Sequence, residues 1–249
     1  MWPKRRLREH EFLHAIVTRF NLGQPSFEWL APRLRLFERF ALPSIQGQTC
    51  QNFTWLLLCD PQTEEKGRRE LERYTSETIQ IVWMGPDRAE YFQRIRELSA
   101  LAHTHLVTTR IDTDDALATH FIGRVQQTAR AAKKRYFINL PAGYHWWNKK
   151  ISSAHHRSNQ FISCCEPLDE FQTVYCDNHT KLRKLGSIVQ VDSRRPSWLY
   201  TCHESNIWNR PQRRKALIWK DEAAVLTHIP INTHVELVAP DAFASESSL

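Results

Sequence analysis

The 249-residue chain carries 34 Lys and Arg against 27 Asp and Glu, a net charge of +7, with 24% charged and 11% aromatic residues. This length and composition suit one large folded domain and exclude a disordered chain. Only 7 residues are glycine, and even the closest pair, Gly67 and Gly85, lies 18 positions apart. A glycine-rich phosphate loop needs several glycines close together, because its backbone amides must approach the phosphate, so P-loop and dinucleotide fingerprints are excluded.

The charge and the start of the chain bear on partners and location. No window approaches the ~18 apolar residues of a membrane span, and the first ten residues lack the apolar core of a signal peptide. We therefore expect a cytoplasmic protein whose 6 cysteines stay reduced. The positive charge indicates an acidic partner, which is a nucleic acid, an anionic membrane or a phosphorylated substrate; a basic surface without any partner fits the charge equally.

Strands and helices alternate along the first half of the chain. Apolar, β-branched runs predict strands at 14–20, 53–59, 78–84, 106–111 and 136–140. Apolar residues at helical spacing predict helices at 27–40, 64–74, 87–102 and 114–134. Pro32 predicts that the first regular helix starts there, and Pro43 predicts its end. Four alternations predict an α/β fold, a Rossmann-type sandwich with a mainly parallel sheet and helices on both faces.

The alternation of strands with long helices ends after residue 141. Short strands without long helices between them are predicted at 151–153, 161–165 and 171–175. We expect this second half to form a mixed sheet that is built onto the first sheet. The whole chain, 1–249, then forms a single domain with a first half at about 12–140, a second half at about 141–235 and a disordered tail at 240–249.

Three carboxylates follow the fourth predicted strand. The segment Thr108-Thr-Arg-Ile-Asp-Thr-Asp-Asp places Asp112, Asp114 and Asp115 at its carboxyl end, which is the edge where open α/β sheets bind ligands. Carboxylates this close repel one another unless a cation lies among them, and their oxygens suit Mg²⁺ or Mn²⁺. The alternative is helix capping, but one Asp suffices for that purpose.

Several segments, in order, resemble the rhamnosyl transferase family and the GT-A fold of nucleotide-sugar glycosyltransferases. The resemblance covers roughly residues 12–210. It rests on Val17-Thr-Arg-Phe-Asn-Leu, Leu36-Phe-Glu-Arg-Phe-Ala-Leu-Pro-Ser-Ile, Phe53-Thr-Trp-Leu-Leu-Leu-Cys-Asp, Arg110-Ile-Asp-Thr-Asp-Asp-Ala-Leu and Pro196-Ser-Trp-Leu-Tyr-Thr-Cys-His-Glu-Ser-Asn-Ile. It implies metal-dependent, inverting transfer of a sugar, with rhamnose as a candidate, from a nucleotide-diphosphate donor to a glycan or lipid-linked hydroxyl acceptor.

The resemblance also assigns the metal ligands. It implies that Asp112 lies near the ribose or the metal, that Asp114 binds the divalent cation, and that Asp115 supports both. A later histidine often completes such sites, and His203 stands at the corresponding place. Because the chain has 12 histidines, an ordinary surface or hydrogen-bonded role for His203 remains open.

The same sheet edge should carry the residues that bind the nucleotide sugar. Thr18, Arg19 and Asn21 end the first predicted strand, and Arg19 either pairs with the diphosphate or is a surface charge. Asp60 ends the second strand, where GT-A enzymes accept a hydrogen bond from a pyrimidine; a turn-forming Asp before proline is the alternative. Arg110 would balance the charge of the carboxylates.

An inverting enzyme needs a base that deprotonates the acceptor hydroxyl. The candidates in the second half are Glu166, Asp169, Asp177 and His179. We favour Asp177, with His179 beside it in the sequence, because Asp177 follows a predicted strand. A second group of residues is a candidate platform for a sugar ring or part of the core, namely Tyr144, Trp146 and Trp147.

Two other classes compete with the transferase. A zinc site would use Cys164, Cys165, Cys176, His179, Cys202 and His203. It is disfavoured because no C-x₂-C pair exists and adjacent strand residues point to opposite faces. A non-catalytic nucleic-acid-binding protein would explain the basic segments, but three acids at a strand end would repel phosphate. The positive charge also permits peripheral contact with an anionic membrane at its inner face.

Overall fold

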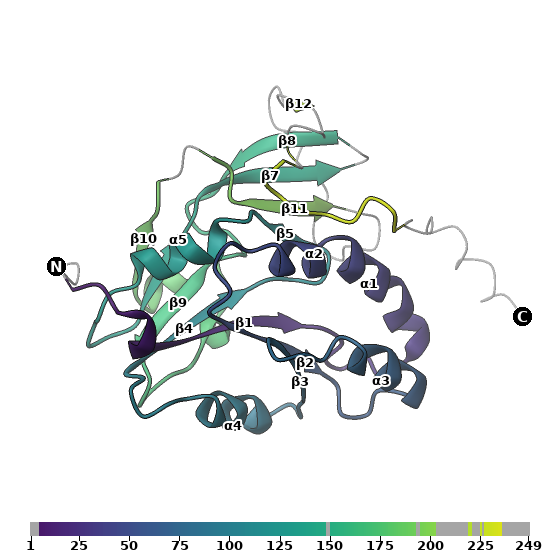
Figure 1. The fold of residues 1–249 in the computed structure, drawn as a ribbon, viewed down its shortest axis with the longest axis horizontal. Helices are drawn as coiled ribbons and strands as arrows, with labels where there is room; N and C mark the ends of the chain where they lie inside the picture. The colour runs from purple at the N-terminus through teal and green to yellow at the C-terminus, as the bar shows by residue number, and fades with distance from the viewer. Residues whose placement is uncertain are drawn as a thin grey trace, which may run out of the picture.

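The computed structural model describes residues 5–147, 150–192, 195–202, 219–220, 225 and 227–235. Within them lies a seven-stranded sheet in the order β10-β6-β9-β4-β1-β2-β3 and a five-stranded sheet in the order β12-β8-β7-β11-β5 (Figure 1). The first sheet consists of β1 (Phe12–Arg19), β2 (Thr54–Cys59), β3 (Ile79–Trp83), β4 (His105–Arg110), β6 (Tyr136–Asn139), β9 (Ser163–Pro167) and β10 (Ser187–Gln190). The second consists of β5 (Ala116–Leu117), β7 (Ala142–Trp147), β8 (Lys150–His155), β11 (Trp198–Cys202) and β12 (Trp219–Lys220).

The helices flank the larger sheet. They are α1 (Phe27–Arg39), α2 (Ala41–Gln46), α3 (Glu65–Glu72), α4 (Ala89–Glu97) and α5 (Phe121–Thr128), with short 3₁₀ turns η1 (Glu9–Glu11), η2 (Val174–Cys176) and η3 (Leu182–Lys184). None of the described helices is long and apolar enough to cross a membrane.

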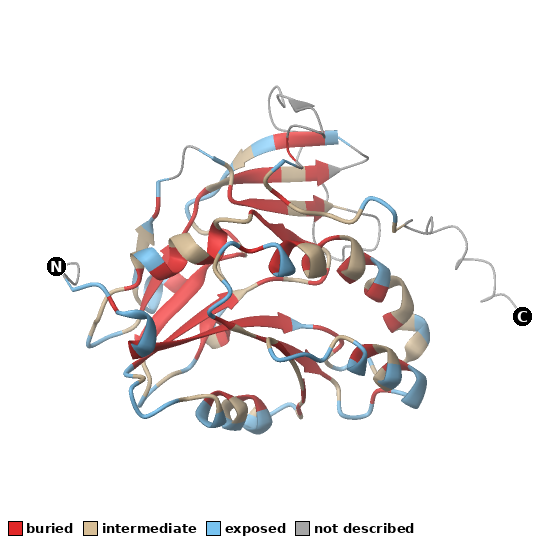
Figure 2. Cartoon of the chain, in the orientation of Figure 1, coloured by how far each residue is buried: buried red, intermediate tan, exposed pale blue. Residues whose placement is uncertain are grey.

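The large sheet is mainly parallel, as predicted. Strand β1 pairs in parallel with β2 and β4, β2 with β3, and β6 with β10, whereas β9 runs antiparallel to both β4 and β6. Strand alternation sends Phe12 and Ile16 of β1 into a core with α1, α2, α3 and α5, and Ala15 and Val17 into a core with α4. Figure 2 shows buried residues throughout the inner strands, so the α/β class with helices on both faces is confirmed.

Pro32 and Pro43 lie at other positions within the first two helices than predicted. Helix α1 begins at Phe27 and continues through Pro32, because its buried face, with Leu30 and Leu34, outweighs the one backbone hydrogen bond that Pro32 cannot donate. Pro43 lies in the first turn of α2 rather than ending a helix, since a first-turn amide has no partner within its helix and proline loses nothing there.

The predicted long helix at 114–134 is wrong. Residues 116–117 instead form β5, which pairs antiparallel with β11, and only 121–128 are helical. The amide of Ala118 donates to the carbonyl of Ser197 at 2.9 Å, which continues this connection to a distant segment. Tertiary pairing therefore overrides the local helical periodicity.

The second half only partly joins the large sheet. The predicted strand 161–165 lies in it as β9, and residues 187–190 join it as β10. The predicted strand 151–153 extends over β8, which pairs with β7 and belongs to the separate sheet. The segment 171–175 is not a strand and leads into η2, because the amides of Gln172 and Thr173 donate to the Glu166 carboxylate and that of Val174 to the Thr108 hydroxyl, not to a neighbouring strand. The predicted tail at 240–249 lies outside the described residues.

Candidate functional site

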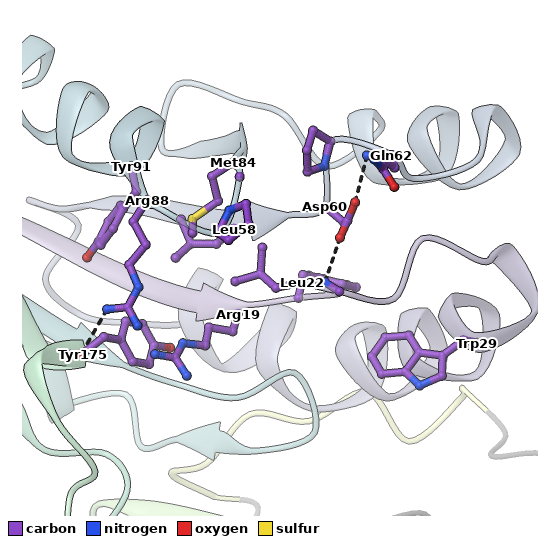
Figure 3. Close-up of a pocket in the computed structure, with 15 residues that line it drawn as sticks. Arg19, Leu22, Trp29, Leu58, Asp60, Gln62, Met84, Arg88, Tyr91 and Tyr175 are labelled. Atoms are coloured by element: carbon purple, nitrogen blue, oxygen red, sulfur yellow. Dashed lines mark hydrogen bonds between the residues drawn. The ribbon is translucent and has the colours of Figure 1, made fainter.

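The carboxyl ends of β1, β2 and β3 open onto a pocket of about 650 Å³ (Figure 3). These strands run in parallel, so the segments that follow them meet at one edge of the sheet. The pocket is lined on one side by apolar residues and on another by cations, among them Arg19, Leu22, Leu58, Met84, Arg88 and Tyr175.

Three arginines surround Tyr175. The guanidinium of Arg19 lies over its ring at 4.0 Å from the centroid, and that of Arg110 at 5.5 Å. Arg88 donates to the Tyr175 carbonyl at 3.3 Å (Figure 3), and the Tyr175 hydroxyl donates to the carbonyl of Val17 at 3.2 Å. Burial lowers the pKa of Arg19, and the charges of Arg110 and Arg88 add to that decrease, while Tyr175 and Asp112 oppose it. A bound anion would offset both effects, so this wall suits a phosphate.

Arg110 links this cationic wall to the carboxylates. Its guanidinium donates to the Asp112 carboxylate at 3.0 Å. Burial alone would lower the pKa of Arg110, but the charge and the hydrogen bond of Asp112 outweigh it and raise that pKa. The sequence prediction that Arg110 balances the carboxylate charge therefore agrees with the geometry of this pair.

Asp115 lies inside the protein. It is fully buried, one carboxylate oxygen accepts a hydrogen bond from the Thr201 amide at 3.0 Å, and the other has no partner among the described residues. Burial, followed by the charges of Asp114 and Asp112, raises the pKa of Asp115 well above its ordinary value. Burial, followed by the charges of Asp115 and Asp114, raises the pKa of Cys202 to about 11, so the end of β11 lies near these two carboxylates.

Asp114 is half-buried, and its charge acts on Arg33 of α1. Burial lowers the pKa of Arg33, and the charge of Asp114 opposes that shift. The Arg33 guanidinium also stacks on the Trp29 ring at 3.5 Å, and Trp29 lines the pocket. Helix α1 therefore connects the pocket to the second carboxylate of the motif.

The carboxylates fit a divalent cation in one particular manner. Over the described part of the chain, no three His, Cys, Asp or Glu side chains converge to hold a metal. Mg²⁺ and Mn²⁺ need only one or two carboxylates when a phosphate and waters complete the shell. Asp112 and Asp114 would be such ligands, and one buried oxygen of Asp115 beside them has no hydrogen-bond partner among the described residues. His203 lies outside the described residues.

Thr18 and Asn21 have structural positions. Thr18 is fully buried, and its hydroxyl accepts a hydrogen bond from the Trp55 indole at 3.0 Å, so it does not line the pocket. Asn21 is 1% exposed, and its amide donates to the Thr63 hydroxyl at 2.8 Å. Both were predicted to bind the nucleotide sugar; the structure places Asn21 where it holds the pocket loops together.

Asp60 lies at the pocket rim. One carboxylate oxygen accepts from the Gly23 amide at 2.7 Å and the other from the Gln62 amide at 2.8 Å (Figure 3). Gly23 has φ of 71°, a left-handed conformation that glycine adopts without strain. The turn-forming role of Asp60 is therefore present in the structure, and its contact with a base would be an additional one.

The four candidate bases differ in their burial and in the residues that surround them. His179 is half-buried; burial and then Arg110 lower its pKa, while Asp112 opposes this, so the ring lies near that ion pair. Asp177 is exposed and accepts a hydrogen bond from the amide of Asn178. Glu166 is 1% exposed and its carboxylate accepts from Arg135 at 2.6 Å, which gives it a structural role. Asp169 is exposed.

Other sequence candidates do not form sites. Tyr144 and Trp146 are each 8% exposed and belong to the core of the second sheet, while the side chain of Trp147 lies outside the described part. Cys164 and Cys165 pack into opposite cores of the large sheet, so they cannot share a zinc ion.

Sequence reasoning missed Tyr175, Arg88, Trp29 and Arg33. None of them lies in the motifs that carried the prediction. A signal exists in retrospect for Tyr175, which precedes the candidate bases in Tyr175-Cys-Asp-Asn-His. Arg88 adopts φ of 63° just before α4, an uncommon conformation for a long side chain and one found often at functional sites.

Comparisons with protein-family models and with solved structures each find matches. A family model described as "Putative rhamnosyl transferase" matches residues 25–215. Among solved structures, the chain is similar to S. aureus TarS 1–349, with 10% identity and a TM-score of 0.41 over 77% of this chain and 60% of that one. It is also similar to 4-diphosphocytidyl-2C-methyl-D-erythritol synthase from Anaerococcus prevotii, with 11% identity and a TM-score of 0.35 over 73% and 88% of the two chains. No curated protein matches the sequence.

Proposed function

Because the chain belongs to the rhamnosyl transferase family, we propose that it transfers a sugar, with rhamnose as the first candidate, from a nucleotide-diphosphate donor to a hydroxyl acceptor. The observation that supports this most is the convergence of Arg19, Arg88 and Arg110 around Tyr175, with Arg110 paired to Asp112. Cations and carboxylates placed together suit a leaving group that carries two phosphates and a metal ion.

The pocket divides into an apolar part and a charged part. Leu22, Leu58 and Met84 line the side near β2 and β3, where a nucleobase would be removed from water. Arg19 and Arg88 line the side near Tyr175, where a diphosphate would lie. This division supports a nucleoside diphosphate better than a neutral ligand.

Asp112 and Asp114 would hold Mn²⁺ or Mg²⁺, with Asp115 as buried support, and His203 remains a candidate fourth ligand from the sequence. When bound, the cation would neutralise charge that develops on the diphosphate. The Arg110 guanidinium lies 3.0 Å from the Asp112 carboxylate, so a cation bound by Asp112 would share this carboxylate with Arg110.

His179 is the better candidate for the base. It lies near the Arg110–Asp112 pair, and its lowered pKa keeps the imidazole neutral and able to accept a proton. In the proposed inverting step, the acceptor oxygen bonds to the anomeric carbon and gives its proton to His179. The bond from that carbon to the diphosphate breaks, and its electron pair stays on the diphosphate oxygen. Asp177 remains the second candidate, and a glycan or a lipid-linked sugar would be the acceptor.

Calorimetric titration of UDP, dTDP and GDP, each with Mn²⁺, tests this proposal. We expect one nucleotide to bind, to raise the melting temperature, and to lose that stabilisation in Asp114→Ala. The control is Glu72→Ala, which removes an exposed carboxylate at the end of α3. If no nucleotide binds while DNA does, the transferase proposal fails and the nucleic-acid alternative replaces it.

A further inference from the structure

The amino edge of the large sheet lies opposite the pocket. Strand β1 starts at Phe12, on the side of Figure 1 where the N-terminus lies, and ends at Arg19 in the pocket. Five segments lie at this edge. Four of them lead into β1, β4, β6 and β10, namely residues 5–11, 98–104, 130–135 and 182–186 in that order, and residues 166–170 leave β9 there. We call these five segments the amino-edge surface.

The amino-edge surface holds much of the chain's positive charge. Its segments contain nine Lys and Arg against five Asp and Glu, a surplus of four in a chain whose net charge is +7. Two of the acids, Glu11 and Glu166, are already paired with arginines. Among the described residues, the exposed cations of this surface that no acid pairs are Arg6, Lys133, Lys134, Arg183 and Lys184, and the exposed acids are Glu9, Asp169 and Glu170.

Two leucines accompany these cations. Leu101, before β4, is 108% exposed and Leu185, before β10, is 42% exposed; they are the large hydrophobic side chains that stand out as exposed among the described residues. Three strand spacings separate β4 from β10 in the order β10-β6-β9-β4, about 14 Å at ~4.8 Å per strand. The loop with Lys133 and Lys134 enters β6, between them.

We propose that the amino-edge surface docks on a membrane rich in anionic lipid. Exposed leucines gain free energy by entering the boundary between headgroups and acyl chains, while the lysines and arginines pair with anionic headgroups. A single-stranded nucleic acid would instead need exposed aromatic rings beside the cations, and both of the exposed large hydrophobic side chains are leucines. Docking on this edge leaves the pocket at the opposite edge free to receive its donor.

Vesicle flotation tests the proposal with the full chain. We expect binding to vesicles that contain phosphatidylglycerol, little binding to pure phosphatidylcholine, and a decrease with added salt. The triple variant Lys133→Gln, Lys134→Gln, Lys184→Gln should bind roughly 100-fold more weakly, the factor expected for three cations near an anionic surface. The variant Leu101→Ser, Leu185→Ser should also bind at least about 10-fold more weakly.

A matched control removes the same charge elsewhere. Lys66 and Arg69 on α3 and Arg73 directly after it are exposed, and their triple Gln variant should float like the unchanged protein. Binding that is independent of lipid charge, unaltered binding of the leucine variant, or self-association that the leucine variant abolishes would each overturn the proposal, as would tighter binding to RNA than to vesicles. Unchanged binding of the Mn²⁺–nucleotide pair in the docking variants separates this test from that of the proposed function.

Discussion

Arg110 and Asp112 form an ion pair, with the guanidinium 3.0 Å from the carboxylate, although they are separated by only one residue. Arg110 also lies 5.5 Å from the centre of the Tyr175 ring. The pair therefore joins the candidate metal ligand to the candidate phosphate wall. If Asp112 binds the proposed metal ion, Arg110 competes with that ion for the same carboxylate.

Because of this competition, we expect Arg110→Gln to change the affinities for the nucleotide and for Mn²⁺ in opposite directions. We expect metal-free UDP, or whichever nucleotide binds, to bind about 10-fold more weakly, because a charge-assisted hydrogen bond is lost. Mn²⁺ alone should bind more tightly, because Asp112 no longer pairs with a cation. Calorimetry of each ligand separately measures both effects. A parallel decrease in both affinities would contradict the competition.

His179 and Asp177 are distinguished by kinetics. We expect His179→Gln to lower kcat about 100-fold or more, with donor KM changed little, because a general base acts in the transition state. Asp177→Asn should retain most of the activity, because its carboxylate is exposed and bonded to the neighbouring amide. The reverse result would assign the base to Asp177.

His14 makes stability depend on pH. It is 2% exposed, its ring donates to the Thr109 hydroxyl at 2.8 Å and accepts from Gln126 at 3.1 Å, and burial lowers its pKa to about 3. The unfolded chain, with a histidine pKa near 6.5, binds the extra proton. The free energy of unfolding should therefore fall as pH decreases below about 6.5, by roughly 3 kcal/mol at pH 4.

Urea unfolding at a series of pH values measures this dependence. The variant His14→Gln, which keeps a polar side chain in place, should lose that part of the slope. His10→Gln removes an exposed histidine nearby and is the control. An unchanged slope in His14→Gln would show that other groups cause the acid sensitivity.

Gly143 is required by the packing of the second sheet. A Cβ at this position would overlap the Trp198 indole, which is fully buried. Gly143→Ala should destabilise the fold by about 1–3 kcal/mol or more, as overpacked cores do. Gly123→Ala is the matched control, because its Cβ would lie 3.7 Å from Cys50 in ordinary contact within α5; it should stabilise by about 0.5–1 kcal/mol. Thermal unfolding measures both.

Local sequence patterns are sufficient to predict the parallel half of the fold. Apolar runs and helical spacing are local patterns, so they predicted β1, β2, β3, β4 and β6 and the helices after the first three of these strands. The same local reading placed the carboxylates after β4, because a motif at the end of a parallel strand reaches the ligand-binding edge whatever the rest of the chain does.

Which side chains meet at that edge depends on contacts between residues far apart in the chain. Tyr175 reaches Arg19 from more than 150 residues away, and no local pattern encodes that distance. Asp115 became a buried group because β11 supplies the Thr201 amide, and residues 116–117 became a strand for the same reason. Long-range pairing can override local preference, because the backbone hydrogen bonds and burial gained exceed the small differences between helix and strand propensities.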